Sequence, residues 1–132
     1  MDQVTDVSSA LQKAIYERLS GLISVPVFDS VPEGTRYPYV TIGRELGSDR
    51  TPLNNRRRRH QRILYLTVWS DYPGQAEVKR INGEVDRALH GVRLALEVGR
   101  VVGLEVSNTD STPDADGVTY QGSVTVKVIT QS

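Results

Sequence analysis

Hydrophobic positions near the N-terminus recur at helical spacing. Six apolar residues lie three or four positions apart and so share one helix face: Val4, Val7, Leu11, Ile15, Leu19 and Leu22. We expect an amphipathic helix that is capped by Asp2 and ends near Gly21. The prolines and glycine that follow predict a loop over residues 24–38, with a short extended piece at 25–28.

The middle of the chain changes from strand to helix patterns. Residues 39–46 alternate between apolar and polar, and residues 62–70 (RILYLTVWS) are largely apolar on both faces, which predicts a strand at the centre of a sheet. A polar stretch separates these two strands. A second helix is predicted from Pro73 and Gly74 to Gly91, with a buried stripe of Val78, Ile81, Val85, Ala88 and Leu89.

Two longer strands are predicted towards the C-terminus. In the first, one face carries Leu94, Leu96, Val98, Val102, Leu104 and Val106; in the second, it carries Val118, Tyr120, Val124, Val126 and Val128. Residues 107–117 between them are dense in turn-forming types, and Gly99 and Gly103 indicate a bulge or close packing. The whole order predicts an α+β fold: a mostly antiparallel sheet of about four strands with two helices packed on one face.

Length and composition limit the class of protein. A chain of 132 residues fits one domain, residues 1–132, and its lack of cysteine excludes disulfides and thiolate metal sites. No apolar run approaches the roughly 18 residues that cross a bilayer. The acidic N-terminus lacks the order of a secretory signal. We therefore expect a soluble protein made in a reducing cytoplasm, with no membrane partner.

Charge is balanced overall but uneven along the chain. Basic and acidic residues both number 16, yet residues 44–62 hold seven arginines against Glu45 and Asp49, an excess of five positive charges. Most of this charge lies in a basic loop at 47–61, whose candidate contact residues are Arg50, Arg56, Arg57, Arg58, Arg59 and His60. The loop either binds phosphate or an acidic protein surface, or it is simply solvated. Nucleic acid is the less favoured partner because no aromatic residues interleave with the arginines.

The remaining candidate chemistry is sparse, and we expect no catalytic, cofactor or metal site. His90, one of two histidines, is predicted to cap the second helix. Asp110, Asp114 and Asp116 favour a hairpin turn over a cation site. Trp69 is predicted to be a core or interface anchor. Tyr37 and Tyr39 either form an aromatic patch for a partner or pack onto the first helix.

The order of these features resembles the tail-completion, or tail-terminator, family of long-tailed phages and gene-transfer particles. The resemblance is carried by the first helix, VFD at 27–29, YPYV at 37–40, LTVWS at 66–70, the second helix and DGVT at 116–119 before the last strand. It implies a non-enzymatic, ring-forming subunit, hexameric in the family, at the head-proximal end of the virion tail. Such a ring caps the tail tube, ends its polymerisation and docks to the head-completion or connector protein. The dense arginine run departs from the family pattern.

Several functions stay open from the sequence. The alternatives are a head-completion or stopper subunit, a tail-tube subunit, and a nucleic-acid-binding module that uses residues 56–59; a small enzyme lacks a candidate site. A cyclic ring needs two different complementary patches on each subunit, and an acidic body with a basic loop supplies such a pair. We hypothesise that Arg56, Arg57, Arg58 and Arg59 contact acidic groups on the tail tube or DNA passing through the lumen.

Overall fold

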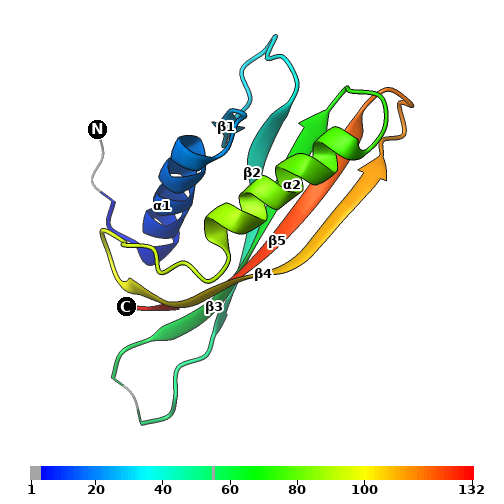
Figure 1. Cartoon of the computed structure of the whole chain (residues 1–132). Helices are drawn as coiled ribbons and strands as arrows, with labels where there is room; N and C mark the ends of the chain where they lie inside the picture. The colour runs from blue at the N-terminus through cyan, green and yellow to red at the C-terminus, as the bar shows by residue number, and fades with distance from the viewer. Residues whose placement is uncertain (1–3, 55) are drawn as a thin grey trace.

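The described part of the chain forms two helices and five strands. The structure is a computed structural model that describes residues 4–54 and 56–132. In chain order the elements are α1 (Val7–Leu22), β1 (Val27–Phe28), β2 (Tyr39–Asp49), β3 (Arg59–Ser70), α2 (Ala76–Leu89), β4 (Arg100–Pro113) and β5 (Tyr120–Gln131) (Figure 1).

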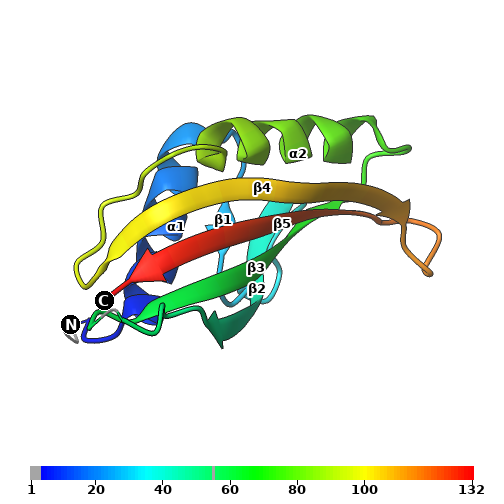
Figure 2. The same cartoon turned by 90° about the horizontal axis from the view of Figure 1, so that it is seen from below.

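The strands form one sheet in the order β1-β2-β3-β5-β4. The short β1–β2 pair is parallel, and the β2–β3, β3–β5 and β4–β5 pairs are antiparallel. Both helices lie on the same face of the sheet, and within the described residues the opposite face is bare (Figure 2). The predicted α+β class and the central position of β3 are confirmed. The fifth strand is the short extended piece, because Val27 and Phe28 pair with β2.

The core lies between the sheet and the two helices. Every second residue of β3 and β5 faces the helices, and these residues pack against the apolar stripes of α1 and α2. The fully buried members include Leu11, Ile15, Leu19, Leu64, Leu66, Val68, Val78, Ile81, Val85, Val124, Val126 and Val128. Burial of each such side chain stabilises the fold by about 1.5–3 kcal/mol before entropy is counted. The predicted stripe of α2 is confirmed throughout.

The boundaries of α1 differ from those predicted. The helix begins at Val7, and its N-cap is Asp6, whose carboxylate accepts the Ser9 N–H at 2.8 Å. Val4 therefore precedes the helix, and the predicted cap Asp2 lies outside the described residues. Asp6 is the N-cap because its carboxylate accepts an N–H group of the first turn that would otherwise lack a partner. The hydrogen bonds to Ser9 also lower the pKa of Asp6.

The strand predicted from Leu94 to Val106 corresponds to β4, and its range is wrong at both ends. Residues 94–98 lie outside the sheet, whereas residues 107–113 belong to β4. Gly99 causes the first difference: its φ of +71° turns the chain, and a Cβ there would lie 2.8 Å from the Gln131 carbonyl oxygen. The second difference arises because β4 pairs with β5 as far as Pro113. The prediction of a bulge or close packing is confirmed, because the close packing lies at Gly99 and a bulge lies beside Gly103.

Register shifts in β4 change which of its residues face the core. The pairing slips between Val101 and Gly103 and again between Val106 and Asn108. Each extra residue moves the following side chains to the other face of the sheet. Val101 and Leu104 are therefore buried, while Val102 and Val106 are only half-buried. The prediction that the apolar residues on both sides of Arg100 share one face of this strand is therefore wrong.

Candidate interaction surfaces

The basic segment is a projecting β-hairpin. Strands β2 and β3 stay paired as far as Asp49 and His60, so only residues 50–58 remain as a loop. The hairpin extends beyond the helices at one end of the sheet (Figure 1). The sequence predicted a longer loop at 47–61, because polar side chains alone do not show that the backbone is paired.

Asp49 holds the base of this loop together. One carboxylate oxygen accepts the Thr51 N–H at 2.8 Å and its hydroxyl at 2.6 Å, and the other accepts the Arg58 guanidinium at 2.8 Å. The Thr51 hydroxyl oxygen in turn accepts the Arg59 N–H at 3.0 Å. The Thr51 hydrogen bonds, and then Arg58, hold the pKa of Asp49 well below its usual range. The sequence reasoning missed this lock, although an Asp two residues before a Thr is a known turn signal.

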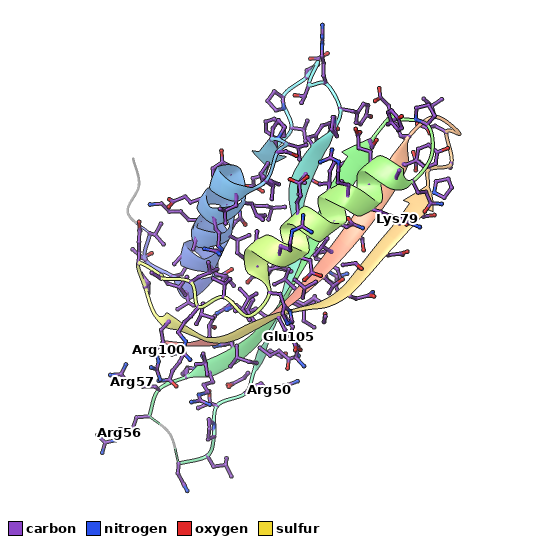
Figure 3. The ribbon with its side chains drawn as sticks, in the orientation of Figure 1. Arg50, Arg56, Arg57, Lys79, Arg100 and Glu105 are labelled. Atoms are coloured by element: carbon purple, nitrogen blue, oxygen red, sulfur yellow. The ribbon has the colours of Figure 1, made fainter. Side chains whose placement is uncertain are left out.

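The six candidate contact residues all lie in the hairpin, but their contacts differ. Arg58 pairs with Asp49, and Arg59 donates from Nε to Gln131 Oε1 at 2.9 Å. His60 is half-buried within β3. Arg50 donates to the Asp49 carbonyl oxygen, whereas Figure 3 shows Arg56 and Arg57 projecting outward. Arg58 and Arg59 therefore have structural roles, and Arg56 is an outward-facing member of the run.

An ion pair buried at the root of the hairpin fixes it to the body. Arg62 donates to Glu45 at 3.1 Å, and their side chains are only 12% and 19% exposed. The Ser8 hydroxyl of α1 donates to the same carboxylate at 2.6 Å, and Arg62 Nε donates to Thr130 Oγ1 at 3.1 Å. A bulge between Ile42 and Glu45 turns the Glu45 side chain to the helix-covered face, so the sequence pattern could not place it.

Three loops at the opposite end of the sheet are acidic. Tyr39, Trp69, Gln121 and Thr112 are cross-strand neighbours, which places residues 29–38, 71–75 and 114–119 at one end. We call these three loops the acidic end. Glu33, Asp71, Asp114 and Asp116 lie there against the single base Arg36, whereas Asp29, which directly follows β1, lies beside α1 near Ser9 and Ile42. Residues 49–59 carry five arginines against Asp49, so the subunit has opposite charge at its two ends.

The last of these loops is a self-contained turn. Asp116 accepts the N–H groups of Val118 and Thr119 at 2.9 and 2.8 Å, and these bonds lower its pKa. Asp114 accepts the Thr119 hydroxyl and the Gln121 amide. The predicted hairpin turn is confirmed, and its donors occupy the carboxylates that would serve a cation.

Comparison with known proteins identifies the family. Residues 9–131 match the sequence model of the family described as tail completion protein gp17. The chain belongs to this tail completion family. It is also similar to a chain in the solved structure of the virion of a native gene transfer agent particle, with a TM-score of 0.85 and 25% sequence identity. That alignment covers 98% of this chain and 100% of the other. No individually curated protein sequence matches the chain.

The family assignment decides between classes of function. Tail completion proteins are structural components of phage or gene-transfer-agent virions and do not form an enzyme family. The protein is therefore a virion tail component, as its resemblance to the family implied. In the residues that the structure describes, no helix has the length and apolar character needed to span a membrane.

The bare sheet face of this family member carries an aromatic cluster. The rings of Tyr37 and Tyr39 stack with centroids 5.3 Å apart, and Phe28 meets Tyr39 edge-on at 5.8 Å. Tyr39 pairs across strands with Trp69, whose indole N–H donates to the Thr41 hydroxyl at 3.1 Å. Burial raises the pKa of Tyr39. Tyr39 faces away from α1, so the predicted packing of this residue onto the first helix is wrong. An interface role for Trp69 stays a prediction.

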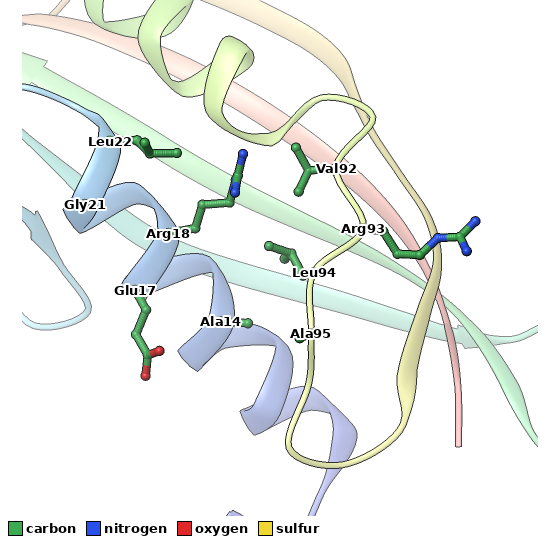
Figure 4. A pocket seen from close by; sticks show the side chains of 9 residues that line it. All are labelled: Ala14, Glu17, Arg18, Gly21, Leu22, Val92, Arg93, Leu94 and Ala95. Carbon is green, nitrogen blue, oxygen red and sulfur yellow. The ribbon is translucent and has the colours of Figure 1, made fainter.

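A shallow groove runs between α1 and the segment that follows α2. It holds about 460 Å³ and is lined by Ala14, Glu17, Arg18, Gly21, Leu22, Val92, Arg93, Leu94 and Ala95 (Figure 4). Arg18 donates to the Ala88 carbonyl at the end of α2, while Arg93 points away. His90 is the C-cap of α2, as predicted, and its Nδ1 accepts the Val106 N–H at 3.0 Å. The side chains of Arg18 and His90 hydrogen-bond to backbone groups and do not point together at a ligand.

Proposed function

We propose that the protein forms a closed ring at the head-proximal end of the tail tube. The ring ends tube polymerisation and presents the surface to which the head-completion or connector protein docks. Its partners are then further copies of itself, the tail-tube protein and the connector, with DNA passing through the lumen. The ring is a hexamer by resemblance to the family, and it assembles in the host bacterial cytoplasm.

The opposite charges at the two ends of the subunit support this proposal. Cyclic rings use heterologous contacts, in which two different surfaces of each subunit meet. The basic hairpin and the acidic end are different surfaces with complementary charge, and they lie at opposite ends of the sheet. A symmetric dimer would need one self-complementary patch instead, which neither of these ends offers.

Light scattering after size exclusion, with negative-stain images of the eluted protein, tests the proposal when it is repeated with purified tail tubes. We expect closed rings, either free or only on tube ends. Filaments of stacked rings would instead identify a tail-tube subunit. A monomer that ignores tubes would refute the ring.

The outward-facing Arg56 gives the sharper genetic test. Serine at all four of residues 56–59 would also remove the Arg58–Asp49 and Arg59–Gln131 contacts inside the chain. The variant Arg56→Ser leaves those contacts in place. It should weaken head–tail joining while keeping the wild-type unfolding temperature, and normal joining would defeat a contact role for the hairpin.

A further inference from the structure

We propose that the basic hairpin of one copy docks on the acidic end of a second copy. The inference rests on the proposed ring, because it names the partner of the hairpin within that ring. The hairpin is residues 49–59, and the acidic end is the three loops 29–38, 71–75 and 114–119. Each copy then contacts one neighbour through its hairpin and the other neighbour through its acidic end.

The charges of the two surfaces are complementary. The hairpin sums to four positive charges, from five arginines and Asp49, and the acidic end to three negative charges, from the four carboxylates of Glu33, Asp71, Asp114 and Asp116 and from Arg36. Since the chain as a whole is neutral, long-range attraction between copies depends on how these charges are separated. Complementary patches of this kind fix orientation and suppress wrong pairings.

Both surfaces also expose apolar side chains. Leu53 at the tip of the hairpin is 104% exposed, as open as a residue in an isolated peptide. At the acidic end, Tyr72 is 57% and Val118 is 63% exposed, and Val31 and Tyr37 are also exposed. An interface typically has an apolar centre with a charged rim, and these residues supply a centre for the charges around them.

Contacts within the chain hold the base of the hairpin and part of the acidic end. Asp49, Thr51 and Arg58 lock the base of the hairpin, and the Arg62–Glu45 pair anchors its root. At the acidic end, Asp116 and Asp114 close the turn, and Ser111 donates to Gln75 at 2.7 Å, which ties β4 to the loop before α2. Little conformational entropy is lost when surfaces that are already fixed associate, so a small contact of this kind is effective.

Paired cysteines test the contact directly, because the wild-type chain has none. Protein carrying Leu53→Cys is mixed with protein carrying Tyr72→Cys or Val118→Cys, assembled with tail tubes and oxidised. The matched control is Leu53→Cys with Leu22→Cys, since Leu22 is similarly exposed but lies on α1. We expect about tenfold more cross-linked dimer from the acidic-end pairs than from the control. Rings on tube ends without this excess would overturn the contact and leave the ring itself standing.

Charge reversal tests whether the hairpin binds a second copy of the protein or a different partner. Arg56→Glu/Arg57→Glu should raise the concentration needed for assembly by about tenfold or more. Adding Glu33→Arg/Asp71→Arg to the same chain should restore assembly to within about threefold of wild type. Failure of this rescue, with a matching loss of affinity for duplex DNA or for tube protein alone, would overturn the proposal. Absence of any ring, with or without tubes, would refute the proposed function and this contact together.

Discussion

Gly122 lies where helix α2 approaches the sheet most closely. A Cβ added at this position of β5 would lie 2.4 Å from Asn82 Oδ1 and 2.5 Å from Val78 Cγ1. Both side chains are buried on α2, and Asn82 Nδ2 donates to the Asp110 carbonyl at 2.9 Å. We therefore expect Gly122→Ala to force α2 away from the sheet or to break the Asn82 hydrogen bond.

The size of the effect follows from three contributions. Overpacking of a buried contact costs about 1–3 kcal/mol. Loss of the Asn82 hydrogen bond adds about 0.5–1.5 kcal/mol. Replacing glycine by alanine returns about 0.4–1 kcal/mol by restricting the unfolded chain. The net expectation is a free energy of unfolding lower by about 2 kcal/mol, which lowers the Tm of a domain of this size by roughly 8 °C.

Urea and thermal unfolding followed by circular dichroism measure this change. Gly103→Ala is the matched control, because Gly103 is also a strand glycine but a Cβ there meets nothing within 4 Å. The control should stay within about 0.5 kcal/mol of wild type. If the two variants were equally stable, the close contact between α2 and β5 would not exist as described. Val78→Ala combined with Gly122→Ala should cost less than the sum of the single changes, since it makes room for the added methyl.

Three further expectations concern the hairpin and its root. Arg62→Ala should lower the free energy of unfolding by about 3 kcal/mol because it leaves the largely buried Glu45 carboxylate without an opposite charge and with the Ser8 hydroxyl as its remaining donor. The exposed pair Lys13–Glu97 is the control, and an equally large loss from Lys13→Ala would contradict the reasoning. Because the folded-state pKa of Asp49 is lowered, its contribution to hairpin order is complete above about pH 4 and is lost as pH falls below it. The protection factors of the Thr51 and Arg59 amides, measured by hydrogen exchange between pH 6 and pH 2 and corrected for the intrinsic pH dependence of exchange, check this. Asp49→Asn should remove their change with pH, and constant protection in the wild type would count against a role for Asp49. Arg56→Ser should weaken head–tail joining with an unchanged Tm, whereas the control Arg93→Ser should join normally, and an equal loss in both variants would point to general charge rather than the hairpin.

The sequence by itself determined the elements that bury a continuous local stripe. Helix α2 and the central position of β3 follow from apolar spacings of three or four residues and from a strand that is apolar on both faces. Such patterns are visible locally because burial repeats with the period of the backbone. The order of these elements was also enough to indicate the family, which depends on sequence order and needs no contact to be known.

Only the tertiary structure decided where the charged and edge residues lie. Arg59 bonds to Gln131 and Arg62 to Thr130, partners 72 and 68 positions away, so no local window reveals that these arginines are structural. The range of β4 depends on pairing with β5 and on the turn at Gly99. One extra residue in β2 sends Glu45 to the covered face. A slip of a single residue reverses a strand's faces at little local cost, so the choice falls to long-range contacts.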